Sequence, residues 1–303
     1  MNFTAKDVQA LREKTGCGMM DCKKALAECD GNMDAAIDFL REKGLASQAK
    51  KASRVAAEGT VCAIVENGVG VVVELNAETD FVAGGEEFKA LALEVAKIIA
   101  SENPADLDAL LKCTKNGQTV EEMVQELFLK IRENIKIRRF VRFEGKVVSY
   151  VHAGGKIGVM VKFDGDVDAA DEEFIAVGKN VAMQIAAMNP GYLDQASVPA
   201  DVIDKEKEIL IAQMKEDPKM ANKPDAVLGK IVEGKISKYY KENCLVEQQF
   251  VIDGDLTVGK YIEKAAKEMG KSFKIVDFVR FEKGEGIEKR VDDFAAEVAS
   301  MIK

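Results

Sequence analysis

The sequence predicts an α+β protein. It should have a small three-helix head, a duplicated core with a three-stranded antiparallel sheet in each copy, an inserted antiparallel helical hairpin and a C-terminal helix. Two observations carry this prediction. Glycine-separated helical patterns fill the first 55 residues, and from Gly59 onward the chain repeats itself. A repeat of this kind indicates one supersecondary unit used more than once, so we expect two similar subdomains.

Residues 1–55 are expected to form three short helices and a linker. Thr4 precedes Val8 and Leu11, which are spaced as on one face of a helix, so Thr4 is a candidate N-cap. Glycines interrupt the helical patterns and should separate the helices: Gly16, Gly18, Gly31 and Gly44. The stretch 46–57 is rich in Ala, Lys and Ser and has no strong apolar face, which predicts the linker.

Two pairs of segments reveal the repeat. Residues 86–104 match residues 172–190 at 10 of 19 positions with an offset of 86. Residues 119–144 match residues 257–282 at nine of 26 positions with an offset of 138, and both end in FVRFE. The constant offsets predict that FVRFE is the same strand in both copies.

The repeat divides the core into unit one, residues 59–144, and unit two, residues 145–282. Each unit is expected to fold as strand, strand, helix, helix, strand. β-Branched runs on both sides of Asn67-Gly68 predict the first hairpin. The offsets differ by 52 residues, which places an insertion in unit two.

The insertion is predicted to form an antiparallel helical hairpin over residues 197–242. Its two helical patterns have narrow apolar stripes and are joined by a proline-containing turn. A narrow stripe suits packing against one partner, so we expect the hairpin to project from the body. After unit two, residues 283–303 should form a Gly-rich turn and a C-terminal helix, because Phe294, Val298 and Ile302 recur every four residues.

Composition excludes several classes of protein. The net charge is −9 and the pI about 5.0, which disfavours direct nucleic-acid binding. No apolar run is long enough to cross a membrane and the N-terminus has no export pattern, so we expect a cytoplasmic protein. His152 is the single histidine, and none of the six cysteines forms a CxxC pair. We therefore expect no catalytic residue, no metal site and no cofactor.

Comparison of the two units nominates a binding segment. Unit one carries NAETDFVAGG between its hairpin and its helix, whereas unit two carries DGDVDAAD there. Thr79, Asp80, Phe81 and Val82 are therefore specific to unit one. On a loop tip, Phe81 beside an acid would be an interface anchor. The alternative, that Phe81 packs into its own core, has equal weight on these grounds.

Two further positions are candidate contacts. Met19 and Met20 lie between the first two predicted helices, and an adaptable methionine surface suits partner binding, although both could instead fill the core of the head. His152 lies in a predicted hairpin turn, where a surface contact and a structural role are equally plausible. A Cys–His nucleophilic pair at His152 is disfavoured because no cysteine has a catalytic sequence context.

Taken together, the motifs resemble the bacterial translation elongation factor Ts family. The resemblance covers nearly the whole chain and rests on five segments: LREKTGCGMMDCKKAL (11–26), NAETDFVA (76–83), ENIKIRRF (133–140), HAGGKIGV (152–159) and GEGIEK (284–289). Cys17 departs mildly from the family, which commonly has a smaller residue between the two glycines. The family's helical hairpin agrees with the predicted insertion.

The resemblance implies a nucleotide-exchange factor rather than an enzyme. Such proteins bind the GTPase elongation factor Tu in its GDP form and accelerate GDP release. Thr79, Asp80, Phe81 and Val82 would be the segment that disturbs the Mg²⁺ and phosphate site of the partner. The head would resemble a ubiquitin-associated three-helix bundle and contact the GTPase domain through Met19 and Met20, and the C-terminal helix would contact that domain again. The hairpin of His152 would approach another domain.

Two other functions are considered. The chain could be a non-exchanging adaptor that docks a partner through its ubiquitin-associated-like head, while its oligomeric state stays open. The difference between the two units at Thr79–Val82 argues against an adaptor, since a plain scaffold has no need of it. A Cys-dependent enzyme would require His152 to be essential.

Overall fold

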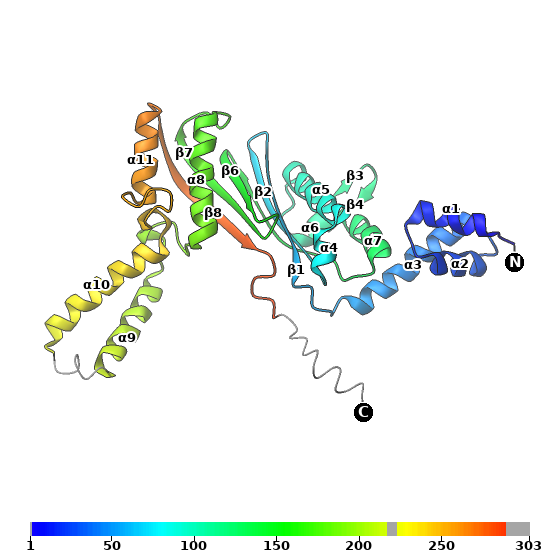
Figure 1. The fold of residues 1–303 in the computed structure, drawn as a ribbon, viewed down its shortest axis with the longest axis horizontal. Helices are drawn as coiled ribbons and strands as arrows, with labels where there is room; N and C mark the ends of the chain where they lie inside the picture. Colours follow the sequence, from blue (N-terminus) through cyan, green and yellow to red (C-terminus); the bar gives the residue numbers. More distant parts are fainter. Residues whose placement is uncertain (1, 217–222, 289–303) are drawn as a thin grey trace.

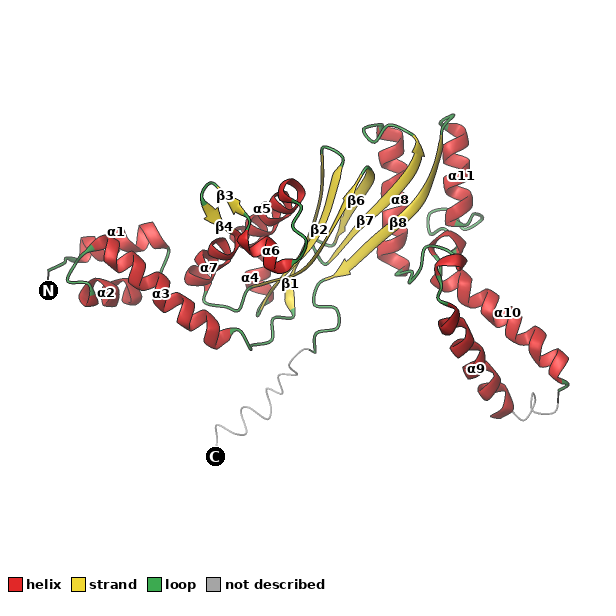
Figure 2. Ribbon diagram, turned by 180° about the vertical axis from the view of Figure 1, so that it is seen from behind, coloured by secondary structure: helices red, strands yellow, loops and turns green. Residues whose placement is uncertain are grey.

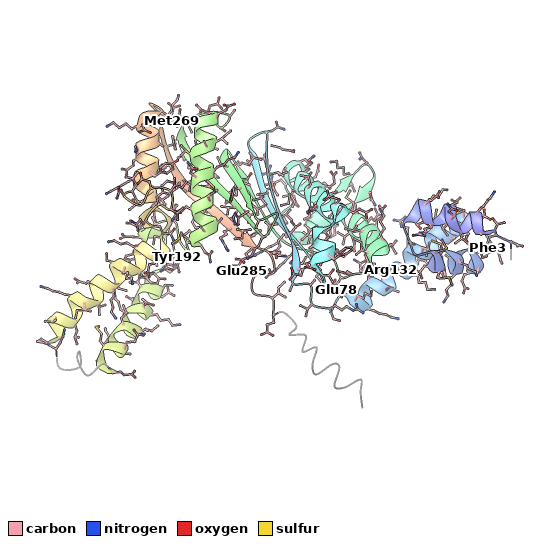
Figure 3. The ribbon with its side chains drawn as sticks, in the orientation of Figure 1. Phe3, Glu78, Arg132, Tyr192, Met269 and Glu285 are labelled. Atoms are coloured by element: carbon pink, nitrogen blue, oxygen red, sulfur yellow. The ribbon has the colours of Figure 1, made fainter. Side chains whose placement is uncertain are left out.

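The computed structural model describes residues 2–216 and 223–288. Figure 1 shows the elements strung along one long axis, with the N-terminal helices at one end, two sheets in the middle and a helical hairpin at the other end. Figure 3 labels Phe3 in the head and Tyr192 near the base of the hairpin, far apart on this axis. Residues 289–303, which hold most of the predicted C-terminal helix, lie outside the described residues.

The head consists of three helices, α1 (Ala5–Thr15), α2 (Met19–Glu28) and α3 (Met33–Lys51). Thr4 is the N-cap of α1, as predicted, and it also forms a capping box with Asp7. The buried residues of the head form one cluster to which α7 of the core adds one side chain: Val8, Leu11, Cys17, Cys22, Ala25, Leu26, Ala36, Leu40 and Leu129.

The predicted end of the third helix is wrong. Helix α3 continues through Gly44 to Lys51, so half of the expected linker 46–57 is helical. A Cβ atom on Gly44 would overlap Cδ2 of Leu129, a residue of the core. Gly44 therefore permits close packing of α3 on the core, which the sequence cannot distinguish from a helix stop.

The first core unit is a three-stranded antiparallel sheet covered by helices. Its strands lie in the order β1 (Glu58–Glu66), β2 (Val69–Ala77), β5 (Lys136–Glu144). Asn67 and Gly68 join the first two strands with φ of 51° and 75°, as a type I′ turn requires. The connection from β2 to β5 holds four helices and a small hairpin: α4 (Asp80–Gly84), α5 (Glu86–Glu102), α6 (Leu107–Lys112), β3 (Thr114–Lys115), β4 (Gln118–Thr119) and α7 (Val120–Ile131).

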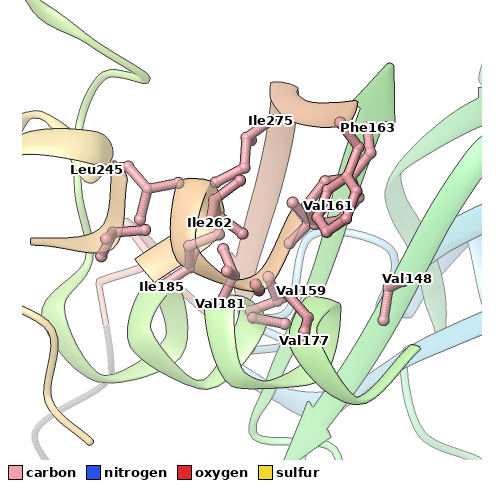
Figure 4. Packing of buried hydrophobic residues seen from close by; sticks show 14 of the residues in the cluster. Val148, Val159, Val161, Phe163, Val177, Val181, Ile185, Leu245, Ile262 and Ile275 are labelled. Carbon is pink, nitrogen blue, oxygen red and sulfur yellow. The ribbon is translucent and has the colours of Figure 1, made fainter. Parts of the chain in front are cut away.

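The second core unit repeats this plan. Its strands lie in the order β6 (Lys146–His152), β7 (Ile157–Asp166), β8 (Ser272–Glu282), with α8 (Glu172–Met188) and α11 (Val258–Glu268) packed on one face. Figure 4 shows the core of this unit, where Val181 and Ile185 of α8 meet Ile262 of α11. The rings of Phe163, Phe174 and Phe273 pack edge to face there.

The two units match residue by residue in their last strand. Phe143 of β5 lies opposite Gly70, and Phe281 of β8 lies opposite Gly158. Both ladders also shift register at the same place, after Glu74 in unit one and after Lys162 in unit two. The prediction that FVRFE is one and the same strand is confirmed, as is the α+β fold class with antiparallel three-stranded sheets.

The sheets pack against each other through a small apolar cluster: Val61, Val72, Val147, Met160 and Phe281. Two equivalent glycines allow this approach. A Cβ on Gly70 would lie 2.6 Å from Sδ of Met160, and a Cβ on Gly158 would overlap Cγ1 of Val61. The two units are therefore joined face to face.

The insertion is a helical hairpin of α9 (Ala200–Glu216) and α10 (Asp225–Asn243). The two helices share their own apolar cluster, which includes Ile203, Leu210, Met214, Val232 and Ile236. Figure 2 shows that the pair projects from the body, as predicted. Short 3₁₀ turns flank it, η1 (Gln195–Ser197) and η2 (Leu245–Glu247). Within the described residues, no helix combines the length and apolarity needed to cross a bilayer.

Candidate functional site

Thr79, Asp80, Phe81 and Val82, the segment specific to unit one, lie at the start of a short helix and not on the expected loop tip. Thr79 is the N-cap of α4, and its Oγ1 accepts a hydrogen bond from the backbone N–H of Val82 at 3.3 Å. Asp80 follows in the first turn, where a negative charge suits the helix N-terminus. The expectation of a loop was wrong because this cap organises the residues that follow it into one helical turn.

Phe81 is 87% exposed, whereas the next two residues, Val82 and Ala83, are buried in the core of unit one. The alternative that Phe81 fills its own core is therefore wrong. The turn is anchored from below by Val82 and presents the phenylalanine ring to solvent. Val82 acts as an anchor in this arrangement, while Thr79 and Asp80 are on the exposed side.

Neighbouring polar residues hold this turn in place. Glu133 accepts two hydrogen bonds from Thr79, one from the backbone N–H at 3.0 Å and one from Oγ1 at 2.8 Å. Glu78 accepts one from the backbone N–H of Asn134 at 2.7 Å and pairs with Arg54 at 3.3 Å. Asn134 itself is buried and donates to the carbonyl of Arg54. Figure 3 labels Glu78 and Arg132 in this region of the molecule.

Sequence reasoning missed the roles of Glu133 and Asn134. These residues begin the motif ENIKIRRF, but nothing in the sequence places them against Glu78 and Thr79, which lie 54 to 56 positions earlier. Two adjacent polar residues just after an amphipathic helix are the one local signal that could have nominated them.

The equivalent connection in unit two presents no large apolar residue to solvent. There Asp171 caps α8 by accepting from the N–H groups of Glu173 and Phe174 at 2.8 and 3.2 Å. Val167, the one large apolar residue in 164–171, is buried. The difference seen in the sequence is therefore a difference in exposed chemistry, since only unit one offers an aromatic ring at this position.

The head presents a second apolar surface. Met19 and Met20 open α2 and are 51% and 73% exposed, so the alternative that they fill the core of the head is wrong. The next residue, Asp21, pairs with Arg132 of the core at 3.0 Å. Arg132 therefore holds the helix of the two methionines, and the next residue, Glu133, holds Thr79 of the Phe81 turn. Neighbouring residues of one loop thus contact both surfaces.

His152 lies apart from these two surfaces, at the end of β6. It is exposed, and its Nδ1 is 2.9 Å from the hydroxyl of Tyr150. The turn that follows is held on unit one, because the carbonyl of Gly155 accepts from the N–H of Val61 at 2.8 Å. The structure does not bring His152 together with Phe81 or with the methionines into one site.

Four of the six thiols are poor nucleophiles. Burial raises the pKa of Cys62 to about 11 and is also the main reason that the pKa of Cys244 is raised to about 11. Burial likewise raises the pKa values of Cys22 and Cys113 above the ordinary value. Thiolate is the reactive form, so these side chains are inert at neutral pH. Across the described residues, no group of three or more His, Cys, Asp or Glu could hold a metal ion.

Comparison with known proteins shows to which family the chain belongs. A family model described as Elongation factor TS matches residues 78–285. The chain is 50% identical to elongation factor Ts of Syntrophotalea carbinolica, with all of both chains covered. It is 49% identical to elongation factor Ts of Clostridium perfringens, with 99% of each chain covered, and 48% identical to that of Nitratiruptor sp., with all of both chains covered. The chain belongs to the elongation factor Ts family of translation elongation factors.

Proposed function

We propose that this chain is a guanine-nucleotide exchange factor, which binds elongation factor Tu carrying GDP and promotes GDP release. The observation that carries the proposal is the exposure of Phe81 on a turn that is capped by Thr79 and fixed by Glu133. A large apolar side chain held rigidly in solvent loses little conformational entropy when a partner buries it. Phe81 is therefore the expected anchor of the interface.

Insertion of the ring would act on the nucleotide indirectly. GDP is held by phosphate-binding backbone and by Mg²⁺, which neutralises phosphate charge. A ring wedged between packed elements of the partner shifts them discretely, because packed interfaces are bistable. A loss of ~4 kcal/mol of nucleotide affinity would correspond to roughly 10³-fold faster release at a constant association rate. Coupling is reciprocal, so bound GDP weakens the grip of the exchange factor by the same factor.

The remaining surfaces would add affinity and orientation. Met19 and Met20 would contact the GTPase domain, His152 would contact another domain of the partner, and Asp80 would make a polar contact beside the wedge. No bond in a substrate is made or broken by this chain, so it acts without catalytic residues, metal or cofactor of its own. Its site of action is the cytoplasm, where translation takes place, and it needs no direct contact with nucleic acid.

The test is release of fluorescent GDP from elongation factor Tu at catalytic amounts of this protein. Phe81→Ala should slow release about 30-fold or more, since an interface anchor contributes ~2 kcal/mol or more. Its thermal midpoint should stay unchanged because the ring is exposed. Leu93→Ala, which removes another partly exposed apolar side chain of unit one, is the matched control and should exchange normally.

Two results would contradict this proposal. A protein that binds elongation factor Tu without accelerating release would be the non-exchanging adaptor. A Phe81→Ala variant that unfolds early, yet exchanges normally in its folded fraction, would show that the ring stabilises this chain and does not act on the partner.

A further inference from the structure

An apolar side chain of the core packs into the head. Leu129 lies on α7, a helix of unit one, but it is buried in the cluster of the head. It meets α3 at Gly44, where an added Cβ would overlap Cδ2 and lie 3.1 Å from Cγ of Leu129. Gly16 makes a similar approach to the next residue, Lys130, whose Cγ is 2.7 Å from where a Cβ would lie. Because these two glycines of the head have no side chain, the head can approach the last turn of α7 closely.

Polar contacts surround this apolar contact. Arg132 pairs with Asp21 of α2 at 3.0 Å, and its backbone carbonyl accepts from Nζ of Lys51 at 2.5 Å. Arg41 of α3 pairs with Glu122 of α7 at 2.9 Å. These pairs are partly exposed, so each adds little stability. Their directionality nonetheless favours one orientation of the head over others.

The loop that follows α7 also contacts the turn that presents Phe81. Arg132 has φ of 65° and ends α7 in the left-handed conformation. Glu133 follows it and accepts both hydrogen bonds from Thr79. The residue that holds Asp21, beside Met20, is thus adjacent to the residue that holds the Phe81 turn.

The head and the core do not pack together over the whole junction. A cavity of about 360 Å³ separates the two parts beside the contact of Leu129 with Gly44. Head residues Lys14, Ile37 and Arg41 line one side, and core residues Gln118 and Gln125 line the other. The other eight buried residues of the cluster that holds Leu129 belong to the head itself, so most of the core of the head does not depend on this junction.

We propose that Gly44, Leu129 and Arg132 are positioning residues for exchange: they set the orientation of the head on unit one, and so the placement of Met19 and Met20 relative to Phe81. The inference rests on the proposed function, since that function gives these two surfaces a common partner. Binding at two linked surfaces is strong only when the linkage matches the spacing of the sites. A misoriented head would lose that match even with every contact residue present.

The test is a pair of glycine substitutions. Gly44→Ala places a methyl group against Leu129 and should push α3 away from α7, which we expect to lower kcat/KM for GDP release about tenfold. Gly229→Ala is the matched control, because it also replaces a glycine inside a helix, and no atom lies within 4 Å of its added Cβ. That variant should exchange as the wild type does.

A compensating substitution separates orientation from stability. Leu129→Ala removes the Cγ and Cδ atoms that the methyl group introduced by Gly44→Ala would meet, so the double variant Gly44→Ala/Leu129→Ala should recover to within about threefold of wild type. Residues in contact couple whatever their role, so the thermal midpoint of each variant is measured beside exchange. A merely structural role predicts that exchange follows the midpoint, whereas a positioning role predicts that exchange recovers although Leu129→Ala lowers the midpoint by leaving a cavity. If the double variant exchanges no faster than Gly44→Ala alone, the proposal is wrong.

Two further arms keep the result decisive. If Gly44→Ala unfolds the head, Arg132→Ala tests the same junction without a clash and should also slow exchange, by about threefold. Phe81→Ala is measured in parallel. Normal exchange by Phe81→Ala overturns the proposed function, whereas slow exchange by Phe81→Ala with normal exchange by Gly44→Ala and Arg132→Ala overturns the positioning role alone.

Discussion

The two core units carry opposite charges at one equivalent pair of residues on neighbouring strands. In unit one, Glu74 of β2 lies opposite Arg139 of β5, and in unit two, Lys162 of β7 lies opposite Asp277 of β8. The neighbouring apolar positions recur with the same register, and both units keep the glycine at which the sheets meet. The apolar positions therefore build the sheet that both units share, while this charged pair is free to differ between the units.

In unit one this pair fastens the chain as it leaves unit two. Glu74 is fully buried and accepts from Nε of Arg139 at 2.6 Å, from Nη1 of Arg138 at 3.0 Å and from the backbone N–H of Gly284 at 2.7 Å. Arg139 also pairs with Glu285 at 3.1 Å. Glu74 therefore holds the segment that follows β8 on the sheet of unit one.

The largest effect expected from this comparison is at Glu74. Glu74→Gln should cost ~3–5 kcal/mol of unfolding free energy in urea, because it leaves two partly buried guanidinium groups without their carboxylate. Burial alone would raise the pKa of Glu74, but hydrogen bonds from Gly284, Arg139, Asn76 and Arg138 outweigh it and hold the pKa below the ordinary 4.5. The stabilisation is thus present above that value and lost as pH falls through the lowered pKa.

Lys162→Gln, the equivalent change in unit two, is the control. Lys162 is part-exposed and lies over the ring of Phe143 at 5.9 Å, so its loss should cost less than about 1 kcal/mol. Equal losses of unfolding free energy for Glu74→Gln and Lys162→Gln would show that the difference in charge between the units has no structural role. A deficit of Glu74→Gln that does not shrink as the pH falls below 4.5 towards acid unfolding would contradict the role of the ionised carboxylate.

A smaller effect should distinguish the two glycines at the contact between the sheets. Gly158→Ala drives a methyl group against Val61, whose branched side chain has little rotamer freedom, and should cost ~1–3 kcal/mol through overpacking. Gly70→Ala meets Sδ of Met160, which is flexible and can move aside, so its cost should be lower. Urea midpoints of both variants check the order, and a larger loss for Gly70→Ala would reverse the argument.

The sequence predicts the repeated parts of this molecule well. Internal comparison locates both sheets because the same apolar spacing and the same FVRFE strand occur twice, and it isolates Phe81 because that residue has no counterpart. Prediction from the sequence fails where the role of a residue depends on a contact with a segment far away in the chain. Gly44 looks like a helix stop but serves contact with Leu129, and the bond from Thr79 to Glu133 joins segments that no local pattern relates.

The smallest effect is expected at His152, the candidate contact in unit two. Its turn is held without the imidazole, since Gly155 lies against Thr60 and accepts from the N–H of Val61. His152→Ala loses the bond to Tyr150, so the unfolding free energy should change by about 0.5 kcal/mol or less.

Exchange by His152→Ala should fall by about fivefold at most, because a contact at the rim of an interface contributes ~1 kcal/mol or less. Phe81→Ala, measured on the same partner preparation, should be slower by at least a further factor of about six. The comparison of the two units then extends to function, since an exposed side chain of unit two adds a contact while one of unit one drives release. A folded His152→Ala protein without any exchange activity would instead make the imidazole indispensable and revive a chemical role for it.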